Sequence, residues 1–289
     1  MLGLSILVGL VWQLDHVLLI QTLVSADPLW FLTALLLAIA ANLVSAMRWQ
    51  RLSGYLGYSQ TLGSFIDWYA RGIAANSVLP GGIVGGDVLR ATLLHRRQPS
   101  PGKARAAQSV LIDRASGFWA LALIGLMGSA AFIGLVPAQH QPAWLGAYAA
   151  GLVAALVGPW LLPTLKWGAI QTLINLRGLL LRVAPLSVLM QLLTIAAYGL
   201  CLKSAGIEPN LALLLAVCAG IFLLAVVPAS LGGFGAREVA SLAMLLPFGL
   251  PAEPIMVGSI LFGLTATLQG ILGLWFWFRK DGEVKNAKH

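Results

Sequence analysis

Apolar runs of about 20 residues recur along this 289-residue chain, and an α-helix needs a run of that length to cross the hydrocarbon of a bilayer. Hydrophobic residues make up 59% of the chain and charged residues only 10%, which is the balance of an integral membrane protein. The short alternating segments of an outer-membrane barrel are absent from the sequence. We therefore predict an all-α integral membrane protein.

Six of the runs are predicted to be full membrane spans, and two longer ones are interrupted. The predicted spans are 2–20, 29–47, 108–136, 144–165, 185–203 and 255–278. The interrupted segments are 62–95 and 211–249. Each contains a proline, a Gly-Gly pair and an arginine four residues after the second glycine, in VLPGGIVGGDVLR at 78–90 and VVPASLGGFGAR at 226–237. Interrupted apolar segments at corresponding places in two halves of a chain indicate the binding site of a transporter.

Lysine and arginine gather in alternate connections between the apolar runs. The basic stretches are 48–51, 90–105, 166–182 and 279–288, and the connections without lysine or arginine are 21–28, 137–143, 204–210 and 250–254. Because cytoplasmic loops carry the excess of these residues, both termini are predicted to be cytoplasmic. Lys203, at the end of a span, is the exception.

This charge pattern makes each interrupted segment enter and leave the membrane on one side, 62–95 from the cytoplasm and 211–249 from outside. Residues 1–136 then read span, span, hairpin, span, and residues 144–278 repeat that order upside down before a cytoplasmic tail, 279–289. We predict six full spans plus two re-entrant helical hairpins arranged as an inverted repeat. The same charges fit a second arrangement, in which the two arms of each interrupted segment are ordinary tilted spans.

Several ionisable side chains fall inside the apolar segments, where each costs about 2.5–3.5 kcal/mol on insertion scales and so needs a partner or a role. Asp67 and Arg71 are four residues apart, which places them on one helical face as either a structural or a functional ion pair. Asn76 lies at the approach to the first turn, where its amide can bond the broken backbone. Asp87 and Arg90 are three residues apart, and Asp87 is either a counter-charge or a cap on the helix that follows.

Two pairs of opposite charge are adjacent in the chain, Asp113 with Arg114 and Arg237 with Glu238. Neighbouring residues on a helix point about 100° apart, because a helix has about 3.6 residues per turn, so we expect neither pair to satisfy itself. Each of these side chains is predicted to reach another element or a hydrated cavity. We expect Arg90, Arg114 and Arg237 to converge on one polar cavity.

The glycine pairs add backbone groups to this predicted site. Helices are expected to begin after Gly86 and Gly233, and a helix N-terminus offers free N–H groups and about half a positive elementary charge. Two such termini, each followed one turn later by an arginine, form a cradle for an anion such as a phosphate diester. The alternative is that the glycines only allow tight turns and close helix packing. The candidate substrate-binding residues are Asn76, Gly85, Gly86, Arg90, Arg114, Gly232, Gly233 and Arg237.

No metal or other cofactor is predicted. The four histidines are scattered over loops and segment ends, and Cys201 and Cys218 stand alone within apolar runs. The sequence contains no GK[ST] phosphate-binding loop, so any energy for transport is expected to come from gradients or mass action. The basic residues follow the topology, and none of them indicates nucleic-acid binding.

At the motif residues the chain resembles the lysylphosphatidylglycerol synthase transmembrane family, also called the flippase-like domain family. The resembling residues are Asn76, Leu79-Pro80-Gly81, Gly85-Gly86-Asp87, Arg90, Asp113-Arg114, and Pro228 with Gly232-Gly233-Phe234-Gly235-Ala236-Arg237-Glu238. The resemblance covers nearly the whole chain and implies a protein of the cytoplasmic (inner) membrane that moves polar lipids between leaflets. In bifunctional members a cytoplasmic aminoacyl-transferase domain follows, whereas this chain stops at His289, so no synthase activity is expected. Family members commonly have a glutamate where this chain has Asp113, and an aspartate can keep the ion-pairing role.

The predicted function is that of a translocase, a flippase-like transporter moving a phosphate-containing polar lipid between leaflets, and not of an enzyme. Arg90, Arg114 and Arg237 are expected to hold the phosphate. The expected counter-charge or coupling residues are Asp67, Arg71, Asp87, Asp113 and Glu238. The resemblance implies a phospholipid, aminoacylated lipid, glycolipid or isoprenoid phosphate as cargo, with a separate lipid-synthesising enzyme as a further candidate partner.

Two other functions stay open at this point. A membrane enzyme acting on lipid phosphates would need clustered carboxylates for Mg²⁺ or a well-placed histidine, and the sequence shows neither. A non-transporting partner of a lipid-synthesising enzyme would bind that enzyme without moving lipid.

Overall fold

The computed structural model describes residues 15–78, 83–135, 144–161, 171–225 and 235–278. Within these ranges the chain forms ten α-helices and one short 3-10 helix, and no strand. The helices are α2 (His16–Val24), α3 (Pro28–Tyr55), α4 (Leu62–Val78), α5 (Ile83–Arg97), α6 (Lys103–Leu135), α7 (Trp144–Leu161), α8 (Gln171–Ser204), α9 (Leu211–Ala225), α10 (Ala236–Leu245), the 3-10 helix η3 (Leu246–Phe248) and α11 (Ala252–Phe278). The predicted all-α fold is confirmed for this part of the chain.

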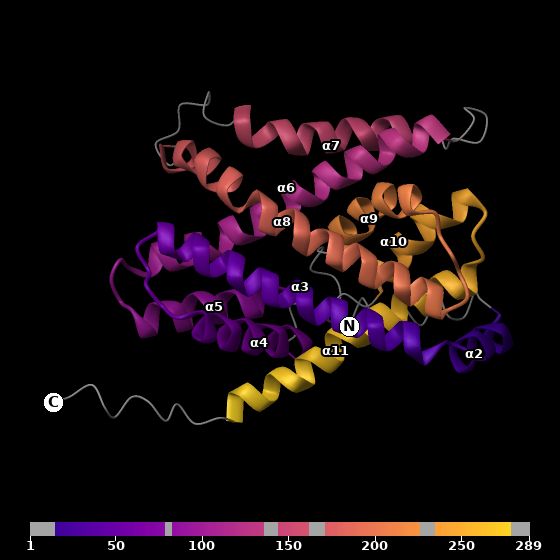
Figure 1. Ribbon diagram of the computed structural model, residues 1–289, viewed down its shortest axis with the longest axis horizontal. Helices are drawn as coiled ribbons and strands as arrows, with labels where there is room; N and C mark the ends of the chain where they lie inside the picture. Colours follow the sequence, from indigo (N-terminus) through magenta and orange to yellow (C-terminus); the bar gives the residue numbers. More distant parts are fainter. Residues whose placement is uncertain (1–14, 79–82, 136–143, 162–170, 226–234, 279–289) are drawn as a thin grey trace.

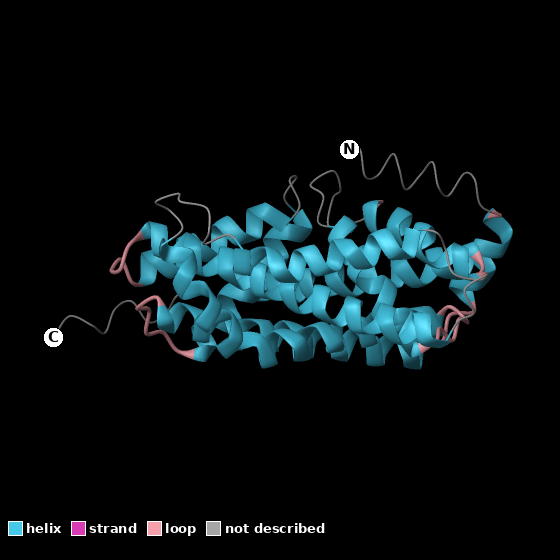
Figure 2. Ribbon diagram, turned by 90° about the horizontal axis from the view of Figure 1, so that it is seen from above, coloured by secondary structure: helices cyan, strands magenta, loops and turns pink. Residues whose placement is uncertain are grey.

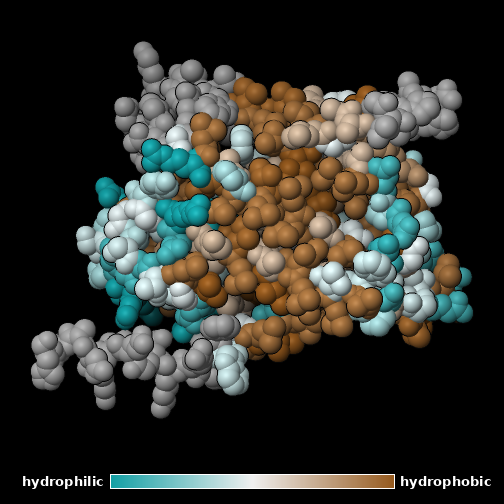
Figure 3. All heavy atoms as spheres, viewed as in Figure 1, coloured by the Kyte–Doolittle hydropathy of each residue, from teal (hydrophilic) through white to brown (hydrophobic). Residues whose placement is uncertain are grey.

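Four of the described helices, α3, α6, α8 and α11, are long and apolar enough to cross a membrane. They correspond to the predicted spans 29–47, 108–136, 185–203 and 255–278. Figure 3 shows a broad hydrophobic band between two more hydrophilic ends, and Figure 2 shows loops gathered at those ends. The chain is therefore a multi-pass membrane protein. Helix α7 lies within the predicted span 144–165, and most of the predicted span 2–20 falls outside the described residues.

Helices α3 and α8 pack against each other in opposite directions. At one end the backbone N–H of Asp27 donates to the carbonyl of Ser204 at 2.9 Å, and the Ser204 hydroxyl donates to the carbonyl of Asp27 at 2.8 Å. Ala34 and Ala38 of α3 are buried against Ala197 of α8. Small side chains of this kind let two membrane helices approach closely, so this contact forms the central seam of the molecule.

The described part of each interrupted segment contains two α-helices packed side by side, α4 with α5 and α9 with α10. Figure 1 places the two pairs toward opposite ends of the long axis. Helix α4 packs on α11, where a Cβ added to Gly273 would collide with the backbone of Ala70. Helix α9 packs on α6, where a Cβ added to Gly128 would collide with the backbone of Ala216. Each pair is therefore held by a long helix from the other half of the chain.

One of the two return helices begins earlier than predicted. Helix α5 begins at Ile83, before the Gly85-Gly86 pair, whereas α10 begins at Ala236, after Gly233 as expected. A glycine inside a helix costs only about 0.5–1 kcal/mol relative to alanine, so packing can carry a helix through such a pair. Helix α10 begins after Gly235, whose φ of 94° is a backbone conformation that glycine adopts without strain.

A cluster of aromatic rings fixes the helices that carry the polar site. Trp49 of α3 meets Phe65 and Trp68 of α4 edge to face, with ring centroids 4.7 and 6.2 Å away. The indole N–H of Trp49 donates to Ser109 Oγ of α6 at 3.0 Å. Leu94 of α5 is buried in the same cluster. Helices α3, α4, α5 and α6 thus share one packed core.

Candidate functional site

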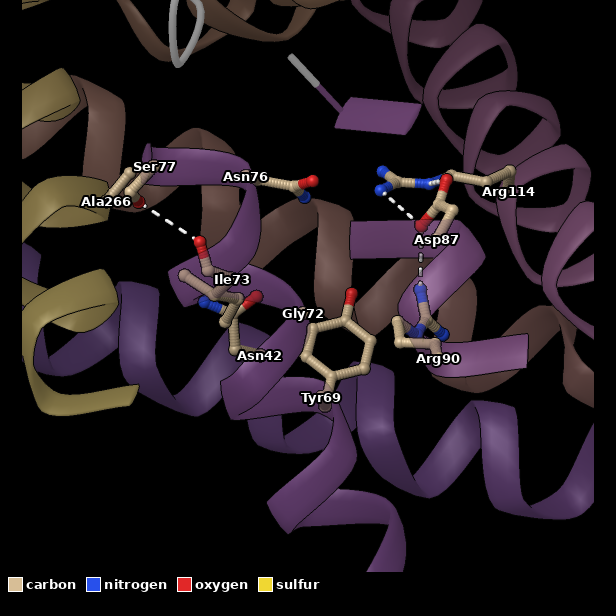
Figure 4. Close-up of a pocket in the computed structure, with 10 residues that line it drawn as sticks. All are labelled: Asn42, Tyr69, Gly72, Ile73, Asn76, Ser77, Asp87, Arg90, Arg114 and Ala266. Carbon is tan, nitrogen blue, oxygen red and sulfur yellow. Dashed lines mark hydrogen bonds and ion pairs between the residues drawn. The ribbon is translucent and has the colours of Figure 1, made fainter. Parts of the chain in front are cut away.

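A polar cavity of about 230 Å³ lies between α3, α4, α5, α6 and α11 (Figure 4). Its lining residues are Asn42, Tyr69, Gly72, Ile73, Asn76, Ser77, Asp87, Arg90, Arg114 and Ala266. The volume is well above the roughly 10–15 Å³ that a single water requires, so the cavity has room for a small polar group.

Asp113 of α6 is the centre of a buried ion-pair network beside this cavity. Its Oδ1 accepts a hydrogen bond from Arg48 Nε at 2.8 Å, and its Oδ2 accepts one from Arg90 Nη2 at 2.8 Å. All three side chains are at most 3% exposed. Arg48 also donates from Nη1 to Ser187 Oγ of α8 at 3.3 Å. One carboxylate therefore ties α3 and α5 to α6, but it supplies one negative charge to two guanidinium groups.

A second carboxylate, that of Asp87 in α5, faces the cavity (Figure 4). Arg114 of α6 holds it with two hydrogen bonds, from Nε to Oδ2 at 2.8 Å and from Nη2 to Oδ1 at 2.9 Å. Arg90 Nη1 lies 3.3 Å from Asp87 Oδ1. Arg114 and Asp87 are 32% and 20% exposed, so a ligand in the cavity can reach this pair.

These contacts settle two expectations. Asp113 and Arg114 do reach different elements, as predicted from their adjacent positions. The alternative that Asp87 caps a helix is wrong, because α5 begins at Ile83 and Asp87 lies inside the helix. Its position there makes Asp87 a counter-charge.

Two aromatic rings lie against the Arg90 guanidinium. Its Cζ lies 4.2 Å from the ring centroid of Trp49 and 4.3 Å from that of Tyr69. Both distances are within the roughly 6 Å over which a cation is attracted to an aromatic face. The two aromatic contacts and the ion pair with Asp113 therefore position Arg90 before any ligand binds. The buried Nε of Arg90 has no hydrogen-bond partner among the described residues.

Asn76 ties α4 to α5, because its Oδ1 accepts the N–H of Gly86 at 2.7 Å. The close approach of α5 to α4 at this point requires glycine, since a Cβ on Gly86 would collide with the carbonyl oxygen of Gly72. The expectation that the Asn76 amide bonds the backbone near the turn is confirmed. With its oxygen engaged, Asn76 offers its NH₂ group as a donor at the cavity that it lines.

The network beside the cavity carries more positive than negative charge. Arg48, Arg90 and Arg114 supply three positive charges, and Asp87 and Asp113 supply two negative ones, which leaves a balance of +1. Buried charge without a counter-ion is costly, because protein and lipid solvate it poorly. A single anion in the cavity would complete the network.

Arg237 lies in a second buried cluster and is not among the described residues that line the cavity. Its Nε donates to Ser259 Oγ of α11 at 3.3 Å, and its Nη2 donates to Glu238 Oε1 at 2.7 Å. Ser259 donates to the same Glu238 oxygen at 3.0 Å. Among the described residues, the expected convergence is therefore seen for Arg90 and Arg114 and not for Arg237, which bonds Glu238 of α10 and Ser259 of α11.

The prediction that Arg237 and Glu238 cannot satisfy each other is wrong. Glu238 lies in the first turn of α10, and its Oε2 accepts the N–H of Gly235 at 2.6 Å. The carboxylate therefore folds back toward the start of the helix, where the long Arg237 side chain can reach it. The separation of about 100° applies to the directions in which side chains leave the helix and not to their ends. This pair balances its own charge.

Five further predicted residues lie away from the cavity or outside the described residues. Asp67 and Arg71 form the expected ion pair within α4, at 3.0 Å, and are not among the described lining residues. Gly85 lies in the first turn of α5 and is not among them either. Gly232 and Gly233 lie outside the described residues, so the cradle of two helix N-termini stays a prediction.

Sequence reasoning missed Arg48, Asn42 and Tyr69. The topology argument assigns Arg48 to a cytoplasmic basic stretch, yet it is buried in the ion-pair network. A signal was present, because Arg48 falls three residues after Ser45 and four before Leu52, on the buried face of α3. Asn42 and Tyr69 carry no comparable signal, since single amides and phenols are ordinary in membrane helices.

Comparison with known proteins places these features in a family. Residues 1–273 match the family described as Lysylphosphatidylglycerol synthase TM region. A comparison with curated proteins finds no match. The matched range includes both helix pairs and every residue that lines the cavity. With both motifs and the whole cavity inside that match, the chain belongs to the Lysylphosphatidylglycerol synthase TM region family.

Proposed function

We propose that this protein is a translocase that moves a polar, phosphate-containing lipid between the leaflets of the cytoplasmic membrane. The observation that carries the proposal is the unmatched positive charge of the network around Arg90 and Arg114, beside a cavity in a membrane-spanning protein. A lipid phosphodiester carries a single negative charge and matches this excess. The family description names the synthase of a phospholipid, which supports a phospholipid or a related phosphate-bearing lipid as cargo.

Arg114 is the residue that would exchange partners during transport. In the structure it holds Asp87 through two parallel donors, and a phosphate presents oxygens in the same geometry. A phosphate entering the cavity would compete with Asp87 for these donors, while Arg90 stays anchored to Asp113. When the phosphate leaves, Arg114 can return to Asp87. Because Arg114 alternates between Asp87 and the phosphate, its charge stays paired in the empty site, and the lipid is released without a chemical step.

We further propose that residues 1–136 and 144–278 form an inverted repeat. Helix packing supports this, because α4 lies on α11 as α9 lies on α6. The arginines support it too: Arg90 reaches Asp113 on α6, and Arg237 reaches Ser259 on α11. An inverted repeat gives a transporter two related states that open to opposite sides.

The two helix pairs are proposed to be re-entrant hairpins that enter from opposite faces, with both termini cytoplasmic. Helices α4, α5, α9 and α10 have 17, 15, 15 and 10 residues. At about 1.5 Å per residue they span about 15–26 Å, which is short of the roughly 30 Å hydrocarbon core. Their lengths favour hairpins over full crossings.

The test is lipid exchange in reconstituted vesicles containing a fluorescent phosphatidylglycerol, with dithionite used to bleach the label in the outer leaflet. Arg114→Gln removes the charge and the paired donors and is expected to abolish protein-dependent exchange. Arg97→Gln makes the same charge change at an exposed position in the last turn of α5 and is expected to leave exchange unchanged.

Folding of both variants is checked by gel filtration and thermal unfolding in detergent. Exchange by folded Arg114→Gln at the wild-type rate would contradict the proposed site. Cleavage of the lipid by the wild-type protein would indicate an enzyme instead. Binding of a lipid-synthesising enzyme without any exchange would indicate the helper function.

A further inference from the structure

A second hollow of about 190 Å³ adjoins the polar cavity, on α3, α4 and α11. We call it the apolar groove. Asn42, Tyr69 and Ile73 line both hollows, so the polar cavity and the apolar groove meet at these side chains. The polar cavity continues from this junction toward Arg90 and Arg114.

Beyond the junction the lining of the groove is almost entirely apolar. Ile39 and Leu43 of α3, Ile66 of α4 and Leu272 of α11 form its walls. Leu43 and Leu272 are 42% and 57% exposed, so the groove is open on the outer surface. Helices α3 and α11 are both long and apolar enough to span the membrane, which makes lipid the surroundings of that opening. A hollow of this kind in a bilayer fills with hydrocarbon.

One polar pair marks the point where the two hollows meet. Asn42 Nδ2 donates to Gln269 Oε1 at 2.7 Å, and Gln269 Nε2 donates to the carbonyl of Thr265 at 3.1 Å. Gln269 is 8% exposed and lines the groove. The lining therefore changes in order from charged groups through neutral amides to hydrocarbon.

We propose that the polar cavity and the apolar groove form one binding site, in which the groove holds a hydrocarbon chain of the lipid whose phosphate lies near Arg90 and Arg114. A polar lipid has the same order of groups as the lining, from a charged phosphate through a polar backbone to a hydrocarbon chain. The amides of Asn42 and Gln269 lie where that polar backbone would lie. This inference rests on the proposed function, because it assigns a place to the same lipid.

The groove acts on orientation more than on affinity. A chain that moves from the bilayer into the groove exchanges one apolar environment for another, so no hydrophobic gain drives the move. The groove extends from Ile66 to Ile73 along α4, which is about 10 Å at roughly 1.5 Å per residue. It therefore guides the part of the chain nearest the headgroup and leaves the rest in the membrane.

The test is photolabelling of the full-length protein by a phosphatidylglycerol that carries a diazirine on its acyl chain, with the labelled peptides mapped by mass spectrometry. The expected labels lie in α3, α4 and α11, around the groove. Leu43→Trp places a bulky side chain in the groove and is expected to lower this labelling about tenfold, since an added side chain cannot share a filled space. Arg114→Gln is expected to lower it as well, because one lipid occupies both hollows.

Leu36→Trp is the matched control. Leu36 lies two turns away on the same helix, is 66% exposed and does not line the groove. Labelling by Leu36→Trp is expected to equal that of the wild type. Leu272→Trp blocks the groove from α11, so the test does not depend on the folding of one variant.

The groove and the proposed function fail in different ways. If photolabelling is unchanged in Leu43→Trp and Leu272→Trp while lipid exchange still depends on Arg114, the chain-binding role of the groove is wrong and the proposed translocation is unaffected. Labelling that depends on both hollows without any lipid exchange would keep the binding site and overturn translocation. Labels spread evenly over the outer surface would overturn the proposal of one shared site.

Discussion

Arg90 and Arg237 occupy matching places in the two interrupted segments, four residues after a Gly-Gly pair, yet their surroundings differ. Arg90 shares two carboxylates with two other arginines beside a cavity. Arg237 has the carboxylate of Glu238 next to it and the hydroxyl of Ser259. The first cluster has charge to offer a ligand, and the second is balanced within itself. A shared motif places an arginine, and its partners decide whether that arginine is available.

This difference assigns different tasks to the two helix pairs. The α4–α5 pair contributes Asp87, Arg90 and Asn76 to the cavity. In the α9–α10 pair, Tyr198 of α8 donates to Ser241, whose hydroxyl donates to the Arg237 carbonyl, so a chain of hydrogen bonds fixes α10 against α8. We infer that the first pair binds lipid and the second pair holds the frame against which it moves.

The largest expected effect comes from removing the central carboxylate of the first cluster. Asp113→Asn would leave Arg48 and Arg90 buried without their shared counter-charge, and breaking a buried ion pair costs about 3–5 kcal/mol. Thermal unfolding in detergent measures this loss. Glu208→Gln is the control, because Glu208 is exposed and an exposed ion pair such as the one it forms with Lys203 contributes little to stability. Equal losses in the two variants would contradict the network.

A smaller loss is expected in the second cluster. Glu238→Gln keeps an oxygen for the N–H of Gly235 but removes the charge that faces the buried Arg237. The loss should lie toward the lower end of the roughly 3–5 kcal/mol that breaking a buried ion pair costs, because it removes the counter-charge of one arginine and not of two. Because the cluster does not line the cavity, lipid exchange per folded molecule should stay close to wild type. A folded Glu238→Gln protein that does not exchange lipid would show that Glu238 takes part in transport. The proposed difference in function between the two clusters would then be wrong.

The two pairs should also differ in their tolerance of a methyl group. In Gly86→Ala the new Cβ would meet the carbonyl of Gly72, which is backbone, so the cost of overpacking should reach about 1–3 kcal/mol. In Gly220→Ala of α9 it would collide with the end of the flexible Met244 side chain, which can turn away, and would come within 3.2 Å of the Tyr148 ring, so only side chains and no backbone would have to move. Thermal unfolding should rank Gly86→Ala as the more damaged, and the reverse order would contradict the close contact of α4 with α5.

The smallest effect concerns Tyr58, in the connection between α3 and α4. Burial raises the pKa of Tyr58 above its ordinary value near 10, although Arg105 opposes the shift. The folded protein thus favours the protonated phenol, which donates to the Gly102 carbonyl at 2.8 Å. Its contribution is complete below pH 10 and is lost as the pH rises through the raised pKa. Tyr58→Phe should reduce the decrease in the free energy of unfolding above pH 10. An unchanged decrease would show that Tyr58 is not its cause.

Much of the fold could be predicted from the sequence because the signals are local. Apolar length marks α3, α6, α8 and α11, and the glycine motifs mark the breaks in the two interrupted segments. The start of α5 could not be predicted, because glycine permits a break in a helix without requiring one. The close packing of Gly86 on α4, which the local sequence does not reveal, accompanies the continuous helix there.

The candidate site was predictable in its residue types and less so in its pairings. Asn76, Asp87, Arg90 and Arg114 line the cavity as the motifs indicate. Arg48 was missed because its partner Asp113 is 65 residues away, and a charge pattern along the chain carries no information on that distance. The Arg237–Glu238 pair was misjudged because helix geometry fixes the first bonds of a side chain and not its end.

The central claim is that the cavity beside Arg114 binds one lipid phosphate. The most direct measurement is the binding of a short-chain, water-soluble phosphatidylglycerol to purified protein, followed by phosphorus NMR. The account predicts saturable binding to one site in the wild type, weakened about tenfold or more by Arg114→Gln, because a paired charge-assisted contact is worth well over 1 kcal/mol. It also predicts unchanged binding in Arg97→Gln. Equal binding by the wild type and Arg114→Gln would contradict it.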